Sequence, residues 1–156
     1  QTCALPISDA FRTVLRACVI ISFRYNVIGS QPTNEQERVY NAVAEKIAGR
    51  QLTEAGPILT ALSSVYPVDS AFKAAFAEKS IRTTQSRNKR VVRYILCALE
   101  QRLSGADLDF DSDSDSISLE HILPEDPQSG WESFSDEEEE ALVYRLGNLK
   151  IGRAHV

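Results

Sequence analysis

The chain has 156 residues, of which 43% are hydrophobic and 25% are charged, and its formal net charge is −5. That length suffices for one domain, or for one domain and part of a second. The acidic balance argues against a uniformly basic nucleic-acid binder. No stretch approaches the roughly 20 consecutive apolar residues that a membrane helix needs.

Both ends of the chain have sequences that look foreign to a natural protein. Residues 1–7 (QTCALPI) are one translated frame of a common sequencing adapter, and residues 151–156 (IGRAHV) are a frame of its reverse complement. We therefore expect both segments to be adapter-like artefacts and exclude them from the prediction of the fold. The natural part would be a truncated internal fragment of a longer protein, from about Ser8 to Leu149.

Within that natural part there are two cysteines, Cys18 and Cys97, and one histidine, His121. The cysteines lack the spacing of metal ligands and are typical of buried thiols in a reducing compartment. We therefore expect a cytoplasmic protein.

Residues 8–104 predict a helical domain of roughly four to six helices, because apolar residues recur at spacings of three and four. The first helix would bury a stripe consisting of Phe11, Val14, Leu15, Cys18, Ile21 and Tyr25. Thr33 or Asn34 is the predicted N-cap of the second helix. The longest helix is predicted from about Arg87 to Leu103, and its buried side would comprise Val91, Val92, Ile95, Leu96 and Leu99.

Residues 105–116 are predicted to form an acidic linker, because five aspartates alternate there with Ser, Leu and Phe. Alternating aspartates also occur in calcium-binding loops. Such a loop needs a glycine at its sixth position and a glutamate at its twelfth, and counting from Asp111 those positions are Ser116 and Ile122. The linker interpretation is favoured.

After the linker, residues 117–123 predict a short β-strand that ends at Pro124. A short helix is predicted to begin at Ser135, and Glu138 three residues later completes a capping-box pattern.

Glu120 and His121 combine the two groups that phosphodiester hydrolysis requires. A neutral imidazole accepts a proton near physiological pH, and a carboxylate is a hard ligand suited to Mg²⁺. Successive side chains of a regular strand point to opposite faces, so a bend before Pro124 would be needed to bring the pair to one site. A lone histidine in such a region is more often structural, and His121 alone does not decide between the two interpretations.

The surrounding motifs resemble the C-terminal HNH-type nuclease domain of the GmrSD-type modification-dependent restriction endonucleases. That family's pattern is an acid-His-Ile-x-Pro segment, a following Trp, and a Tyr-Arg-Leu-Gly-Asn-Leu segment. The three parts of this pattern correspond here to Glu120–Pro124, Trp131 and Tyr144–Leu149. The helical region is also similar, though less specifically, over Tyr25–Gly29, Thr33–Asn34 and Lys89–Leu96.

The resemblance implies a mainly α protein in which a helical domain precedes an incomplete ββα-metal (HNH) nuclease domain at residues 117–150. It implies that His121 is the general base and Glu120 a ligand of Mg²⁺ or Mn²⁺. Asn148 would be the asparagine of the second strand, whose side-chain amide holds the connecting loop. The substrate would be DNA, either modified or foreign, and the parent protein would serve in defence.

The resemblance also implies parts that this sequence lacks. Family members continue after Asn148 with a closing helix that supplies a further Asn and a Lys, and Lys150 occupies a position where the family usually has Thr. Members also carry an upstream NTP-using domain. We therefore expect the fragment itself to be inactive.

A basic cluster around the start of the longest predicted helix has two interpretations. It consists of Arg82, Arg87, Lys89, Arg90 and Arg93, of which the last four are the candidate DNA-binding residues. Such a cluster can neutralise phosphates, or it can be the exposed or interdomain face of an amphipathic helix. The alternative to a nuclease as a whole is a non-catalytic helical interaction module with a structural histidine in its tail.

Overall fold

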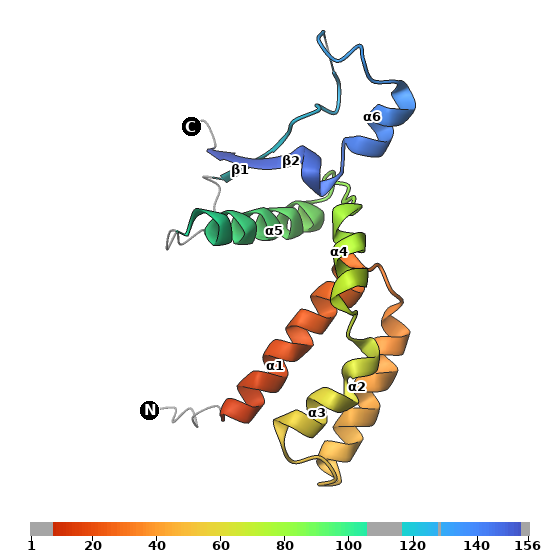
Figure 1. Ribbon diagram of the computed structural model, residues 1–156, viewed down its shortest axis with the longest axis vertical. Helices are drawn as coiled ribbons and strands as arrows, with labels where there is room; N and C mark the ends of the chain where they lie inside the picture. Colours follow the sequence, from red (N-terminus) through yellow and green to blue (C-terminus); the bar gives the residue numbers. More distant parts are fainter. Residues whose placement is uncertain (1–7, 106–116, 128, 154–156) are drawn as a thin grey trace. The chain divides into compact units, whose positions relative to one another are not determined.

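The computed structural model describes residues 8–105, 117–127 and 129–153 of the chain. The chain divides into two compact units, Gln1–Phe76 and Ala77–Val156, so the boundary falls inside the range predicted as one helical domain. The described elements are mainly helical, with one two-stranded sheet in the second unit (Figure 1). Residues 1–7 and most of the predicted acidic linker (106–116) lie outside the described residues.

In its described residues, the first unit contains five helical elements before its last helix begins. Helix α1 (Asp9–Ser22) continues as a π-helix (Phe23–Ile28) that ends at Gly29. Helix α2 (Thr33–Ala48) and helix α3 (Ala55–Ala61) follow, and a 3-10 turn (Ser63–Val65) leads to α4 (Asp69–Ala77). The core of the unit consists of Ile21, Val39, Val43, Ile58, Leu62 and Val65.

Two predictions for the first unit were wrong in part. The N-cap of α2 is Pro32, and Thr33 is already the first helical residue. Of the predicted stripe on α1, Ile21 is buried, but Phe11 and Leu15 are 55% and 51% exposed. The apolar stripe is longer than the surface that packs on it, because α3, which contacts α1, leaves these two side chains exposed.

The second unit combines one long helix with an antiparallel hairpin. Helix α5 (Ser86–Ser104) confirms the longest predicted helix, and it ends at Gly105 in the left-handed conformation that favours glycine. Its predicted buried side is wrong at Leu99, which is 41% exposed. Strand β1 (Ile117–His121) pairs with β2 (Leu149–Arg153), and the register places Glu120 opposite Lys150 and His121 opposite Leu149. Helix α5 contacts β2.

The two strands are joined by a long connection that carries a short helix, α6 (Asp136–Leu142). The predicted capping box is confirmed, because the Ser135 side chain accepts from the Glu138 backbone N–H while the Glu138 carboxylate accepts from the Ser135 N–H. A 3-10 turn (Leu146–Asn148) then precedes β2, so Asn148 lies immediately before the second strand. No helix follows β2 among the described residues.

Ser135→Ala is expected to lower the free energy of unfolding of the second unit by about 1 kcal/mol, the usual cost of losing a side-chain N-cap. The measurement is urea unfolding followed by fluorescence of Trp131, the single tryptophan of the chain. Ser133→Ala, at an exposed position two residues earlier, is the matched control. Equal losses in the two variants would contradict a specific role for the cap.

Among the described residues, no helix is both long enough and apolar enough to cross a membrane. Among the described residues, Cys97 is buried in α5 and Cys18 is partly buried in α1. Burial raises the pKa of the Cys97 thiol, and the nearby charge of Arg93 offsets that rise only in part.

Candidate active site

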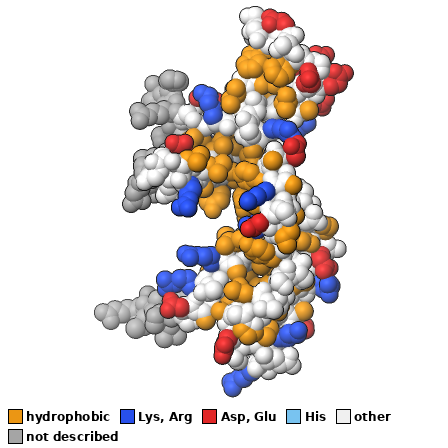
Figure 2. Space-filling view, in the orientation of Figure 1, with side chains coloured by type: hydrophobic (Ala, Val, Ile, Leu, Met, Phe, Trp, Pro, Cys, Tyr) orange, Lys and Arg blue, Asp and Glu red, His pale blue; other side chains and the backbone are white. Residues whose placement is uncertain are grey.

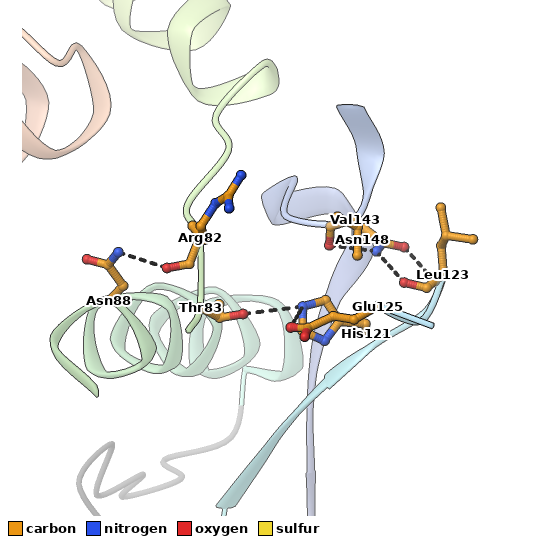
Figure 3. Close-up of polar contacts among 8 residues, drawn as sticks. All are labelled: Arg82, Thr83, Asn88, His121, Leu123, Glu125, Val143 and Asn148. Carbon is orange, nitrogen blue, oxygen red and sulfur yellow. Dashed lines mark hydrogen bonds and ion pairs between the residues drawn. The ribbon is translucent and has the colours of Figure 1, made fainter. Parts of the chain in front are cut away.

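The site is built where the chain leaves β1 and enters the connection to α6. His121 is the last residue of β1, and Leu123, two residues later, is buried. The polar contacts in Figure 3 come from this point, from the turn before β2, and from the segment that leads into α5.

Asn148 fastens the loop that follows His121. Its side-chain oxygen accepts from the Leu123 N–H at 2.7 Å, and its amide nitrogen donates to the Leu123 carbonyl at 2.9 Å and to the Val143 carbonyl at 2.9 Å. Its own carbonyl accepts from the Ile122 N–H at 2.8 Å. Only an amide side chain offers two donors and an acceptor in this arrangement. Asn148 therefore fixes the backbone immediately after His121.

His121 lies in a largely enclosed environment, with its side chain 14% exposed. Its Nε2 atom is 3.3 Å from the hydroxyl of Thr83 and 3.5 Å from a carboxylate oxygen of Glu125 (Figure 3). The ring of Tyr144 meets the imidazole edge to face, with the ring centres 5.8 Å apart and the planes at 81°. The imidazole is thus held by side chains from three separate segments.

One of those segments, residues 78–83, runs alongside the Tyr144–Leu146 stretch. The Ile81 N–H donates to the Tyr144 carbonyl at 2.9 Å, and the Leu146 N–H donates to the Lys79 carbonyl at 2.9 Å. An ion pair between Arg145 and Glu78 adds a side-chain contact. These bonds fix the position of the segment, which carries Thr83 to His121.

Sequence reasoning missed Thr83 and Glu125. Thr83 lies 38 residues before His121, in a segment that carries no recognisable motif, and only the tertiary fold brings it close. Glu125 follows Pro124, and its carboxylate approaches the imidazole because the loop turns back after β1. The signal for Glu125 in the sequence was its spacing of four residues from His121.

The structure does not bring Glu120 to the same place as His121. Glu120 is on the regular part of β1, where neighbouring side chains alternate between faces. Its carboxylate pairs with Lys150 across the hairpin at 2.6 Å and accepts from the Ser118 hydroxyl at 3.0 Å. The Glu120 carboxylate also lies so close to Gly152 that a Cβ atom added to Gly152 would collide with this carboxylate. The two carboxylates that flank His121 in sequence, Glu120 and Glu125, thus have different partners.

The described residues contain no group of three or more His, Cys, Asp or Glu side chains that could hold a metal ion. Mg²⁺ does not require such a group, because it is usually held by one or two carboxylates, with water and substrate phosphates completing its shell. Glu120 has the right chemistry for this role, and its side chain is 38% exposed. An ion pair that is this exposed contributes at most about 1 kcal/mol and can exchange partners.

A cleft of about 320 Å³ opens beside Glu125 and Tyr144. Its charged lining comprises Arg82, Glu125, Asp136, Glu139 and Glu140. Four carboxylates against one guanidinium disfavour the approach of a phosphate unless cations accompany it. The acidic side chains at the start of α6 gather at one end of the view in Figure 2.

The predicted DNA-binding residues all lie on the first two turns of α5. Arg87, Lys89 and Arg90 are exposed, whereas Arg93 is partly buried. Arg82, just before the helix, places its guanidinium 5.3 Å from the centre of the Tyr144 ring. Through the Thr83 contact, the start of α5 lies near His121, so the basic side chains and the imidazole belong to the same unit.

A histidine at the end of the first strand of a hairpin, with an asparagine before the second strand that fixes the loop after it, is the arrangement that the motifs around His121 and Asn148 predict. A model of the family described as "GmrSD restriction endonucleases, C-terminal domain" matches residues 66–152. The chain belongs to this family, in which DNA is the substrate of a restriction endonuclease. Comparison with curated proteins and with solved structures gives no match.

The family match has two further features. It begins at residue 66, so it includes the segment that carries Thr83 and all of α5. It ends at residue 152, within the last strand and inside the segment predicted to be adapter-derived. Residues 151–153 of that segment are the last three residues of β2, and they pair with β1 through the backbone. Backbone pairing of this kind places few demands on the identity of the side chains.

Proposed function

We propose that the chain carries part of the active site of a metal-dependent DNA endonuclease, in which His121 is the general base that activates water. The observation that supports this most directly is the position of His121 beside a loop fixed by Asn148. Near neutral pH an unprotonated imidazole can take the proton of water as it attacks the phosphorus atom. Asn148 acts on the backbone around the base, not on the substrate.

The proposed metal is Mg²⁺ or Mn²⁺, and Glu120 is the residue that would hold it. A bound divalent ion would stabilise the charge that develops on the phosphate. To take this role the Glu120 carboxylate must leave Lys150, and the end of β1 must bend toward Pro124. Lys150 is the residue at which the sequence departs from the family pattern, so the partner that holds Glu120 here is not one that the resemblance implies.

This chain, tested by itself, is expected to show no cleavage above background with Mg²⁺ or Mn²⁺. The resemblance implies a closing helix that supplies a further Asn and a Lys, and residues 151–156 contain neither. The assay is nicking of supercoiled plasmid DNA by the 156-residue chain. Robust metal-dependent nicking that persists after further purification would contradict the proposal that the site is incomplete.

Binding of DNA is proposed to involve the exposed cations at the start of α5. Replacing Arg87, Lys89 and Arg90 together by glutamine is expected to weaken DNA binding and to reduce the slope of log K against log salt by about 2 to 3, since each phosphate contact contributes about 0.9. Arg93 is left unchanged because it is partly buried. Fluorescence anisotropy with a labelled duplex at several salt concentrations measures the effect.

The matched control for this prediction carries the same change of charge in the first unit. Arg12, Arg16 and Lys46 are exposed there and can also be replaced by glutamine. The control is expected to retain most of the slope. If both triple variants lose the same slope, the cations of α5 are not a preferred contact for DNA.

The second candidate function is a non-catalytic helical interaction module. It is favoured by the apolar residues exposed on α1, where Phe11, Leu15 and Val19 are 55%, 51% and 59% exposed at spacings of four. Contiguous exposed apolar side chains are typical of protein–protein contacts. Loss of cleavage on replacing His121 in an active, longer form of the chain distinguishes the nuclease from this alternative.

A further inference from the structure

Thr83 is one of the most deeply buried polar residues in the described part of the chain, with only 2% of its surface exposed. It is the last residue of the 78–83 segment that is hydrogen-bonded to Tyr144 and Leu146, and two residues separate it from α5. The Asn88 side chain on α5 donates to the Arg82 carbonyl at 2.8 Å, which ties the start of α5 to the same segment. The Thr83 backbone is therefore held between the hydrogen-bonded residues before it and the first turn of α5 after it.

The two polar neighbours of the His121 Nε2 atom are both oxygens. The Thr83 hydroxyl at 3.3 Å can either donate or accept, but the Glu125 carboxylate at 3.5 Å can only accept. If Nε2 carried a lone pair, that lone pair would face the negative carboxylate. With the proton on Nε2, both oxygens act as acceptors and the contact with the carboxylate becomes attractive. The geometry around Nε2 therefore favours one tautomer of the neutral imidazole.

The ring has little freedom to leave this arrangement. Tyr144 meets it edge to face, and the Arg82 guanidinium lies over the Tyr144 ring 5.3 Å from its centre. Tyr144, in turn, is bonded through its carbonyl to Ile81, in the same segment that carries Thr83. The segment before α5 thus both orients the imidazole and supports the aromatic ring that packs against it.

We propose that Thr83 is a positioning residue that, together with Glu125, holds His121 in the tautomer with its proton on Nε2. The nitrogen that takes the proton of water is then Nδ1, which carries the lone pair in this tautomer. This inference rests on the proposed role of His121 as general base. It assigns a function in the nuclease site to the helical segment before α5, which the motifs around His121 and Asn148 do not include.

The test uses the whole chain labelled with ¹⁵N and needs no nuclease activity. The imidazole signals of His121 are assigned by their absence from His121→Gln, which separates them from those of His155. We expect the neutral ring to carry its proton on Nε2 and that proton to exchange slowly with water. In Thr83→Val, which keeps the shape and loses the hydroxyl, exchange is expected to become roughly tenfold faster, the effect of losing one hydrogen bond.

Two further variants separate positioning from simple packing. Thr83→Ser retains the hydroxyl and should keep exchange slow, whereas Thr84→Val, at an exposed neighbouring position, should change nothing. A neutral ring protonated on Nδ1 in the unmodified chain would overturn the inference even if Thr83→Val failed to fold. Unchanged exchange in a folded Thr83→Val chain would overturn it as well. Neither result depends on cleavage, so the role of His121 as a base could fail or survive separately.

Discussion

His121→Ala is expected to reduce Mg²⁺-dependent DNA cleavage by about 10²- to 10⁴-fold, the range that a positioned general base contributes. The measurement requires a form of the chain in which a closing helix with the family's Asn and Lys follows Leu149, because the 156-residue chain is expected to be inactive. Water must then lose its proton to solvent during its attack on phosphorus, since no imidazole accepts it. Affinity for DNA should change little, because the proposed phosphate contacts lie on α5.

The imidazole is also a packing element, so loss of structure must be separated from loss of the base. The His121 side chain is only 14% exposed and contacts Thr83, which is itself buried. Thermal unfolding of the variant and addition of free imidazole to the assay address this point. Partial recovery of cleavage with imidazole in a folded variant supports the assignment. Undiminished cleavage by folded His121→Ala would show that another group is the base.

Asn148→Ala is expected to lower the free energy of unfolding of the second unit by about 3 kcal/mol, because each of its side-chain hydrogen bonds contributes about 1 kcal/mol. The variant leaves the N–H and carbonyl of Leu123 and the carbonyl of Val143 without their side-chain partner. Urea unfolding followed by Trp131 fluorescence measures the loss. Trp131 lies in the connection that Asn148 fixes, so it reports on the relevant unit.

Two comparison variants sharpen this prediction. Asn148→Asp keeps the oxygen that accepts from the Leu123 N–H. It replaces the amide NH₂ that donates to the Leu123 and Val143 carbonyls by a charged oxygen, so this variant should be destabilised as well. Gln101→Ala, at an exposed position of α5, should have an effect within about 0.5 kcal/mol. A loss below about 1 kcal/mol for Asn148→Ala would mean that water replaces the amide at these groups.

The elements that could be predicted from the sequence are those governed by local patterns. The apolar spacing between Val91 and Leu99 predicted α5, and the pairing of Ser135 with Glu138 predicted the start of α6; both are confirmed. The exposed positions of Phe11 and Leu15 could not be foreseen, because an apolar stripe does not reveal how much of its length a neighbouring helix covers. The apolar spacing also does not reveal that α1 continues as a π-helix.

The candidate site was predictable where it follows a motif and unpredictable where it depends on tertiary contacts. The family motif predicted His121 and Asn148 as site residues, and the alternation of strand side chains already indicated that Glu120 would point away from His121. The environment of the imidazole comes from Thr83, which no local pattern connects to β1. The catalytic and metal-binding roles of these residues, including that of Glu120, stay predictions.

The most direct test of the central claim is nicking of supercoiled DNA by an extended form of the chain, in which a closing helix with the family's Asn and Lys follows Leu149. Unmodified protein, His121→Ala and the 156-residue chain are compared with Mg²⁺, with Mn²⁺ and with a chelator. The proposed function predicts nicking by the extended unmodified protein alone, and only when a metal is present. Absence of cleavage by the folded, metal-supplied extended protein on both plain and base-modified DNA would contradict it.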